Sequence, residues 1–194
     1  MSDAITQLAT ALDTTERIIA AIRPDQWHNA TPCAEWDVHA VASHLVLGHR
    51  LFVRALHGEE FAAGSRPSGP PQITEDVRTA YRSSADELLA AFREAGALER
   101  LIVVPAGRVP GQAALYLRLV EAVVHGWDLA RATGQPIDFP EEPVRTALEF
   151  TKKRFAQQPP GPGPFAPPQP VSEGAPAITQ LVGLLGRSSA DLTT

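Results

Sequence analysis

The stretch LVEAVVHGWDLARA is the feature that most narrows the possible folds. Glu121, His125 and Asp128 follow one another at intervals of four and three residues, so on a helix they form one column. The valines and leucines beside this column are apolar, which indicates that it faces at least partly inward. Burying an ionisable group costs several kcal/mol unless the group is paired, hydrogen-bonded or bound to a metal. The helix therefore needs a neighbour that supplies such partners.

Helical spacing of apolar residues recurs along the chain. Asp37 is expected to cap one helix at its start, and Gly134 lies just after another. The β-prone residues 101–104 are expected to form an extended crossing rather than a sheet. The expected long helices cover residues 3–22, 38–58, 74–95, 112–133 and 143–157. The first four of these, followed by the fifth helix and a tail, predict an all-α fold built on a four-helix bundle.

The chain of 194 residues is expected to form a single domain over residues 1–194. Its tail is expected to contain a Pro-rich strap over residues 157–176 and a short helix over residues 177–186. The sequence LVGLLG in that helix is apolar enough to seek a partner, so a homodimer is one expectation for the assembly.

Charge and composition exclude several classes of protein. A net charge of -5 and a pI near 5.7 argue against nucleic acid as a partner. The apolar runs are too short to span a bilayer, and the N-terminal residues follow an amphipathic helix pattern rather than that of a signal peptide. Cys33 is the only cysteine, so there is no disulfide framework and no cysteine-rich zinc module. We therefore expect a cytoplasmic protein that binds a small-molecule substrate and not a membrane.

His44 is the second candidate for chemistry, in an apolar helical stretch where Gly48 is expected to leave space beside the ring. The alternative is an ordinary core histidine. His39 and His49 are each five residues away, roughly 140° round the helix, and are expected to face solvent. Glu121 and His125 also have a simple alternative, because an acid and a histidine four residues apart often form a surface contact worth a few tenths of a kcal/mol.

Together, His44, Glu121 and His125 would supply two imidazoles and one carboxylate from two facing helices. This set suits zinc with open coordination positions, or nickel or iron. Asp128 could orient an imidazole as an outer partner, or form a salt bridge with Arg118 or Arg131, and the sequence leaves both open. Motifs of other chemistries are missing: there is no HExxH, P-loop, GxGxxG or GxSxG. Cys33 is expected to be structural.

Two longer stretches carry a resemblance. TPCAEWDVHAVASHLVLG and LVEAVVHGWDLARATGQP resemble signatures of the DinB-like superfamily, and more closely those of proteins related to the metal-binding N-terminal domain of mycothiol-dependent maleylpyruvate isomerase. The tail FAPPQPVSEGAPAITQLVGLLGR is similar to tails of a compact actinobacterial branch of this group. The resemblance implies a DinB-like four-helix bundle with a divalent metal, often zinc, held by His44, Glu121 and His125 and completed by water. It also implies that the metal activates a low-molecular-weight thiol such as mycothiol.

The resemblance and the residues together favour a metal-dependent thiol S-transferase that acts on a small electrophile. The maleylpyruvate isomerase has a further C-terminal domain, which argues against isomerase activity for this shorter chain. The alternatives are a non-catalytic metal-binding or small-molecule-binding protein, and other metal chemistry such as hydrolysis or non-haem iron oxidation. No general acid or base can be assigned, although Asp128 is the nearest candidate.

Overall fold

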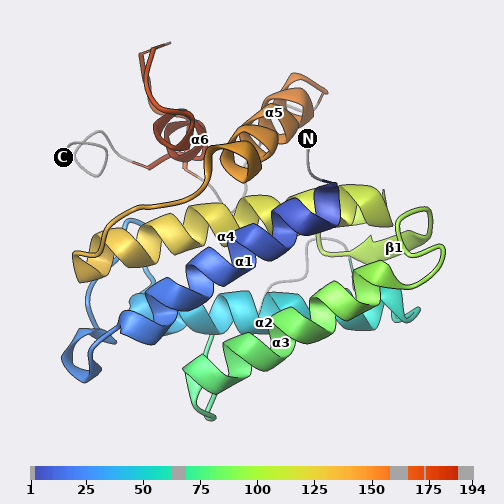
Figure 1. Cartoon of the computed structure of the whole chain (residues 1–194), viewed down its shortest axis with the longest axis horizontal. Helices are drawn as coiled ribbons and strands as arrows, with labels where there is room; N and C mark the ends of the chain where they lie inside the picture. Colours follow the sequence, from blue (N-terminus) through green and yellow to red (C-terminus); the bar gives the residue numbers. More distant parts are fainter. Residues whose placement is uncertain (1–2, 63–68, 158–165, 173, 188–194) are drawn as a thin grey trace.

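Six α-helices and one β-hairpin make up the regular structure of the described residues, apart from a single 3-10 turn at Pro24–Gln26 (Figure 1). The structure is a computed structural model that describes residues 3–62, 69–157, 166–172 and 174–187. The elements, in chain order, are α1 (Ala4–Ala21), α2 (Val38–Leu56), α3 (Val77–Arg93), β1 (Leu101–Val104), β2 (Gly107–Pro110), α4 (Gly111–Thr133), α5 (Glu141–Gln157) and α6 (Ala177–Leu184).

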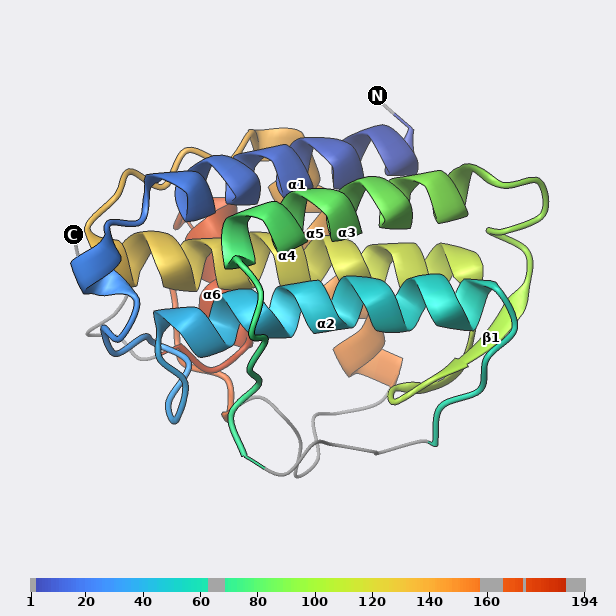
Figure 2. The ribbon, with the colours of Figure 1, turned by 90° about the horizontal axis from the view of Figure 1, so that it is seen from below.

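Helices α1 to α4 form a four-helix bundle, as the sequence predicts. Helix α1 packs against α4 and α3, and α2 packs against α3 and α4, so the four lie side by side in Figures 1 and 2. Two of the expected helix ends are also confirmed. Asp37 caps α2 by accepting a hydrogen bond from the backbone N–H of Ala40, and Gly134 ends α4 in the left-handed conformation at φ +68°.

Helix α4 is the central helix, with α1, α2 and α5 packed around it. Its buried residues lie on all sides, which is typical of a helix enclosed by others. At Gly126 the neighbouring helix comes very close, since a Cβ there would lie 2.5 Å from Thr15 Oγ1. Thr15 also donates a hydrogen bond to the carbonyl of Ala122. This enclosure is the reason why His125 and Asp128 of the ionisable column are shielded from water.

Helices α5 and α6 lie on the outer side of α4 and pack against each other. Leu181, Val182 and Leu185, in and just after α6, are buried within the chain. The apolar residues on which the expectation of a homodimer rested are thus largely used inside the molecule, and the homodimer stays a prediction. Residues 158–165 and 173 of the expected strap lie outside the described residues, and residues 166–172 follow no regular pattern.

Two expectations about local structure were wrong. Residues 101–104 do not form an extended crossing, because β1 pairs with β2 in an antiparallel hairpin, with Ile102 opposite Val109. The third helix begins later than its expected start at Thr74: Asp76 is the capping residue and accepts from the N–H of Thr79. Among the described residues, none of the helices is long and apolar enough to cross a membrane.

Candidate metal centre

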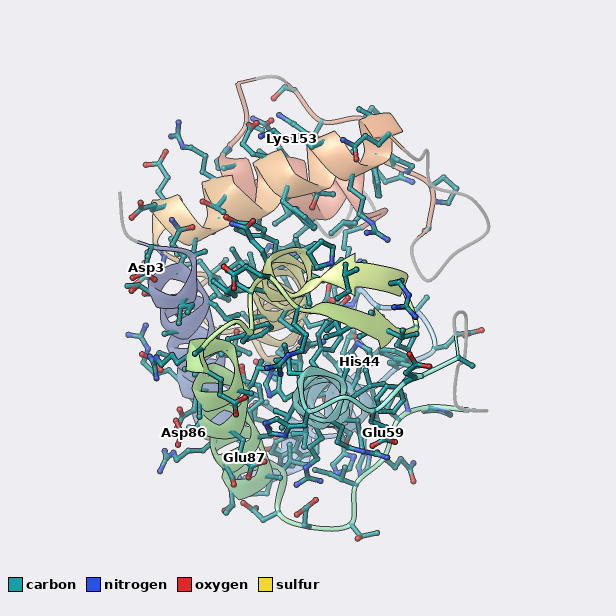
Figure 3. The ribbon with its side chains drawn as sticks, turned by 90° about the vertical axis from the view of Figure 1, so that its right-hand side faces the viewer. Asp3, His44, Glu59, Asp86, Glu87 and Lys153 are labelled. Atoms are coloured by element: carbon teal, nitrogen blue, oxygen red, sulfur yellow. The ribbon has the colours of Figure 1, made fainter. Side chains whose placement is uncertain are left out.

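His44 of α2 meets Glu121 and His125 of α4 between the two helices. His44 Nε2 lies 2.8 Å from Glu121 Oε2, and His125 Nε2 lies 3.4 Å from the same oxygen. The two imidazole rings meet edge to face, with centroids 5.0 Å apart. Figure 3 looks along the bundle and labels His44 beside α2, whereas Asp86 and Glu87 lie at the periphery on α3. The structure therefore brings together the three residues that the sequence selected.

The three side chains fit a divalent metal by their spacing and chemistry. Each offers one ligand atom, and these atoms lie within 4.8 Å of one another. Around tetrahedral zinc, with bonds of about 2.0–2.2 Å, donor atoms lie about 3.3 Å apart, close to the 2.8 Å and 3.4 Å found here. The side chains of His44 and Glu121 are 30% and 22% exposed, so the cluster is open to solvent on one side. That the cluster binds a metal stays a prediction.

Asp128 lies one helical turn beyond His125 and is completely buried. Its Oδ2 accepts a hydrogen bond of 3.0 Å from His125 Nδ1. Its carboxylate also binds Arg187, at 3.0 Å from Nε to Oδ1 and 2.5 Å from Nη2 to Oδ2. Asp128 thus both contacts an imidazole and forms a salt bridge, the two interpretations that the sequence left open. The salt-bridge partner is Arg187 rather than the expected Arg118 or Arg131. Spacing along one helix cannot reveal a partner 59 residues away.

Burial and hydrogen bonding compete at this cluster. Burial by itself would raise the pKa of Glu121, but hydrogen bonds with His125 and His44 outweigh it and hold that pKa well below its usual range. Burial lowers the pKa of His44, and Glu121 offsets only part of this effect. Burial also acts to lower the pKa of His125, but the carboxylates of Asp128 and Glu121 outweigh it, so this pKa is raised. The cluster therefore presents an ionised Glu121 between two imidazoles, which suits a cation.

Two residues of the connector before α2 complete the surroundings. The ring of Trp36 lies 4.8 Å from that of His44 and 6.2 Å from that of His125, measured between centroids. The thiol of Cys33 forms a second group with His125 and Asp128, whose ligand atoms also lie within 4.8 Å of one another. Burial and the charge of Asp128 raise the pKa of Cys33 to about 11, so the thiol stays protonated at neutral pH. Periodicity could not place either residue, because the connector is irregular.

A buried guanidinium lies one turn before Glu121. Arg118 is 2% exposed, and its Nε and Nη2 have no hydrogen-bond partner among the described residues. Its guanidinium lies over the ring of Phe52, 5.2 Å from the centroid. A Cβ on Gly48 would lie 2.6 Å from Arg118 Nη1. The sequence suggested that Gly48 makes room for the ring of His44. In the structure it makes room for Arg118 instead.

The expectation that His49 faces solvent was wrong. The residue is fully buried, its Nδ1 lies 3.0 Å from Ser84 Oγ, and its ring packs against Tyr81. Helix α2 is enclosed by α3 as well as α4, so a side chain that points away from His44 is buried against α3 instead. His39 is only partly buried and meets the ring of Trp27 edge to face.

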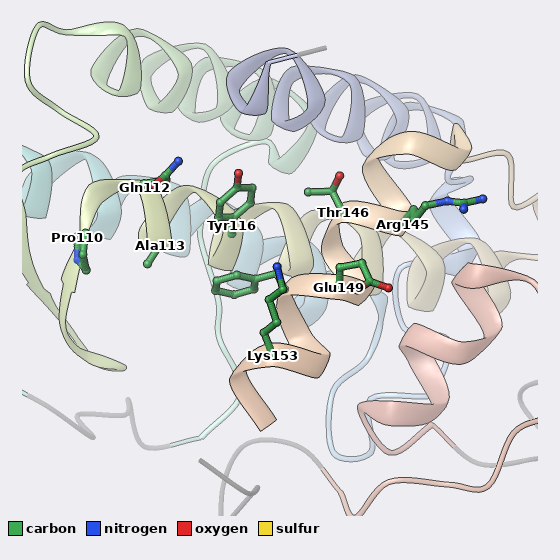
Figure 4. Close-up of a pocket in the computed structure, with 9 residues that line it drawn as sticks. Pro110, Gln112, Ala113, Tyr116, Arg145, Thr146, Glu149 and Lys153 are labelled. Atoms are coloured by element: carbon green, nitrogen blue, oxygen red, sulfur yellow. The ribbon is translucent and has the colours of Figure 1, made fainter. Parts of the chain in front are cut away.

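A groove of about 540 Å³ lies elsewhere, between α5 and the beginning of α4 (Figure 4). The rings of Tyr116 and Phe150 pack together in its lining, 5.3 Å apart. Its residues are Pro110, Gln112, Ala113, Tyr116, Arg145, Thr146, Glu149, Phe150 and Lys153. None of these belongs to the cluster of His44, Glu121 and His125, and the groove holds no convergent set of metal ligands. The cluster is therefore the stronger candidate site.

The fold and the site define a class of protein: a four-helix bundle that holds two histidines and a carboxylate between two neighbouring helices. The chain belongs to the mycothiol maleylpyruvate isomerase N-terminal domain family, which matches residues 8–130. The matched region contains His44, Glu121 and His125 and ends before Arg187. The resemblance seen in the sequence is thereby confirmed.

Relatives cover nearly the whole chain. Over 179 residues it is 32% identical to two uncharacterised proteins of Mycobacterium tuberculosis, MT0763 and Rv0738, and each alignment covers 92% of this chain and 94% of the relative. Crystal structures of the mycothiol-dependent maleylpyruvate isomerase and of a histidine-to-alanine mutant of that enzyme match with TM-scores of 0.62 and 0.65. Each has 17% identity and covers 81% of this chain and 72% of the other. This similarity shows the same fold.

Proposed function

We propose that this protein binds a divalent metal, zinc by preference, and uses it to transfer a low-molecular-weight thiol of the mycothiol type to a small electrophile. The observation that carries the proposal is the meeting of two imidazole nitrogens at one carboxylate oxygen of Glu121, on the partly open side of the bundle. Membership of a family named for a mycothiol-dependent enzyme supports the choice of thiol. When bound, the cation would supply Lewis-acid stabilisation of a thiolate, which makes the thiol nucleophilic at neutral pH.

The residues around the cluster would have different roles in this reaction. His44, Glu121 and His125 would hold the metal, and the exposed side of the cluster would admit thiol and electrophile. The ring of Trp36 would shield the histidines from water, since it packs against both. In the reaction the sulfur exchanges its bond to hydrogen for a bond to carbon, and the proton passes to solvent. If the electrophile has a leaving group, that group departs with the electron pair of its bond to carbon. If the electrophile has an activated double bond, the electron pair shifts along that bond and the resulting anion takes up a proton from solvent, so no further reactant is needed.

Neither Cys33 nor Asp128 suits a direct role in that reaction. The raised pKa of Cys33 keeps its thiol protonated, which makes it a poor nucleophile. Asp128 is completely buried and is engaged by both His125 and Arg187. It therefore cannot reach a substrate, and orienting His125 is the role that its contacts support.

The proposal is tested on untagged protein by elemental analysis and by a conjugation assay with mycothiol. Purified protein is expected to contain zinc and to accelerate conjugation of mycothiol to a haloalkyl bimane or to chlorodinitrobenzene. His125→Ala should lose the metal and lower the rate by more than about 100-fold, because even outer-partner changes at metal sites cost about 10- to 100-fold. His57→Ala, which changes an exposed histidine paired with Glu94, should leave both unchanged.

The possible outcomes separate the two parts of the proposal. Zinc-loaded protein that conjugates mycothiol to none of several electrophiles would overturn the transferase activity and favour the non-catalytic metal-binding alternative. Iron in place of zinc would favour oxidation chemistry. Metal content unchanged in His125→Ala would overturn the metal centre itself.

A further inference from the structure

The C-terminal segment reaches the outer side of the candidate metal centre through one residue. Arg187 lies just beyond α6, after Leu185 and Gly186, and is 4% exposed. It binds both oxygens of Asp128, from Nε to Oδ1 and from Nη2 to Oδ2. A planar guanidinium that meets a carboxylate with two parallel hydrogen bonds fixes its orientation as well as its charge.

The chain turns after α6 in a way that directs Arg187 inward. Gly186 has φ +82°, and a Cβ on it would lie 2.3 Å from the carbonyl oxygen of Ala166. The N–H of Arg187 bonds to the carbonyl of Val182, and its Nη1 bonds to the carbonyl of Leu185. The turn and the side chain are thus held by separate contacts, and the direction of Arg187 is built into this segment.

Asp128 connects Arg187 to His125, which is a candidate metal ligand. Its Oδ2 binds both Arg187 Nη2 and His125 Nδ1. The hydrogen bond at Nδ1 sets which imidazole nitrogen carries the proton and leaves Nε2 directed at Glu121. Without the guanidinium, the buried Asp128 carboxylate would keep only His125 as a side-chain partner among the described residues, which is unfavourable. It would then turn toward other donors or water, and His125 would lose its orientation.

We propose that Arg187 is a positioning residue that holds His125 in its metal-binding orientation through Asp128, so that the C-terminal segment sets the metal affinity of the bundle. This inference rests on the proposed metal centre. It goes beyond the family match, which ends at residue 130 and so does not include this segment. The tail is then part of the functional unit rather than only a cover over the helices.

The test is a titration of metal-free protein with cobalt(II), followed by its visible spectrum and by competition with a chelating dye. Arg187→Met is expected to weaken cobalt binding by about 10- to 100-fold and to change the intensity of the cobalt bands, because a ligand moves. Arg187→Lys, which keeps the charge but not the two-pronged contact, should lose less. In an Asp128→Asn background, Arg187→Met should have no further effect, since the link is already broken.

Leu185→Ala is the matched control, because Leu185 is a buried residue of the same segment that has an apolar side chain. It should lower the melting temperature yet leave the cobalt affinity and spectrum unchanged. If Leu185→Ala and Arg187→Met weaken binding equally, Arg187 is merely structural and the inference is overturned. The inference is also overturned if Arg187→Met binds cobalt with the affinity of the wild type. If Arg187→Met fails to fold, Arg187→Lys takes its place, and cobalt binding by Arg187→Lys with wild-type affinity overturns the inference. A wild-type protein that binds no cobalt would instead reject the metal centre.

Discussion

His44 and His49 lie on the same helix but have opposite surroundings. His44 faces a carboxylate across the gap to α4 and is partly open to solvent. His49 is fully buried beside Ser84, and burial, with the charge of Arg118 as a smaller contribution, holds its pKa well below the ordinary value. Ser84 itself donates to the carbonyl of Tyr81, so it accepts from His49 Nδ1. The contact that a histidine makes thus separates a candidate ligand from a structural residue.

The neutral state of His49 predicts a pH dependence of stability. Unfolded, His49 has a pKa near 6.5 and gains a proton as the pH falls, whereas in the folded state it stays neutral. The unfolded state then binds more protons, so the free energy of unfolding decreases as the pH falls below this pKa. The contribution of neutral His49 to stability is fully present at pH values above it. Between about pH 7.5 and 5.5, wild type should lose about 1.4 kcal/mol more than His49→Gln. Urea denaturation of both proteins in a chelator measures this difference, and equal losses would contradict it.

The packing of α2 on α4 depends on a glycine and an arginine. Glycine inside a helix costs about 0.5–1 kcal/mol relative to alanine. Gly48 has a compensating reason, because Arg118 occupies the place of its absent Cβ. Arg118 is itself unfavourably placed, since burial lowers its pKa and Glu121 only partly opposes this. Together the two residues set how closely these helices approach beside the candidate centre.

A double-mutant cycle tests this packing. In the wild type, Gly48→Ala should lower the free energy of unfolding by about 1–2 kcal/mol, because the new methyl group collides with the guanidinium. In an Arg118→Met background the guanidinium is absent and the side chain is shorter. There, Gly48→Ala should leave the free energy of unfolding unchanged or raise it by up to about 1 kcal/mol. Chemical denaturation of the four metal-free proteins gives the coupling. The same effect of Gly48→Ala in both backgrounds would show that Arg118 does not occupy that space.

Across the whole molecule, the candidate centre links two helices that are far apart in the chain. His44 and Glu121 are separated by 77 positions, and the link from Asp128 to Arg187 adds the C-terminal segment. A metal held by both α2 and α4 would bind the folded chain and not the unfolded one. Its binding energy would therefore appear as stability of the entire bundle.

Removal of the metal should accordingly lower the melting temperature. At a free zinc concentration 100 times the dissociation constant, the folded state should gain about 2.7 kcal/mol over the chelated protein. His44→Ala should abolish this gain, whereas His57→Ala should keep it, because His57 lies away from the cluster at the end of α2. Calorimetry with and without zinc measures the shift. An equal gain in wild type and His44→Ala would place the stabilising metal elsewhere.

Much of this architecture could be read from the sequence, because the relevant signals are local. The spacing of apolar residues located all the long helices, and Asp37 and Gly134 marked ends that need only neighbouring residues. Glu121 and His125 are one turn apart, so their shared face follows from helix geometry alone. Choosing His44 as their partner also required the expectation that two helices face each other.

The remaining features depend on the path of the chain, which periodicity does not describe. Whether residues 101–104 pair depends on the turn that brings β2 alongside. The burial of His49 depends on α3 covering the second face of α2. The partner of Asp128 depends on a segment that returns after α5 and α6. Local sequence was enough for the helices and for the pairing of Glu121 with His125, because these contacts span one helical turn. Which distant segments pair was decided by tertiary packing, because many partners would satisfy the same local pattern.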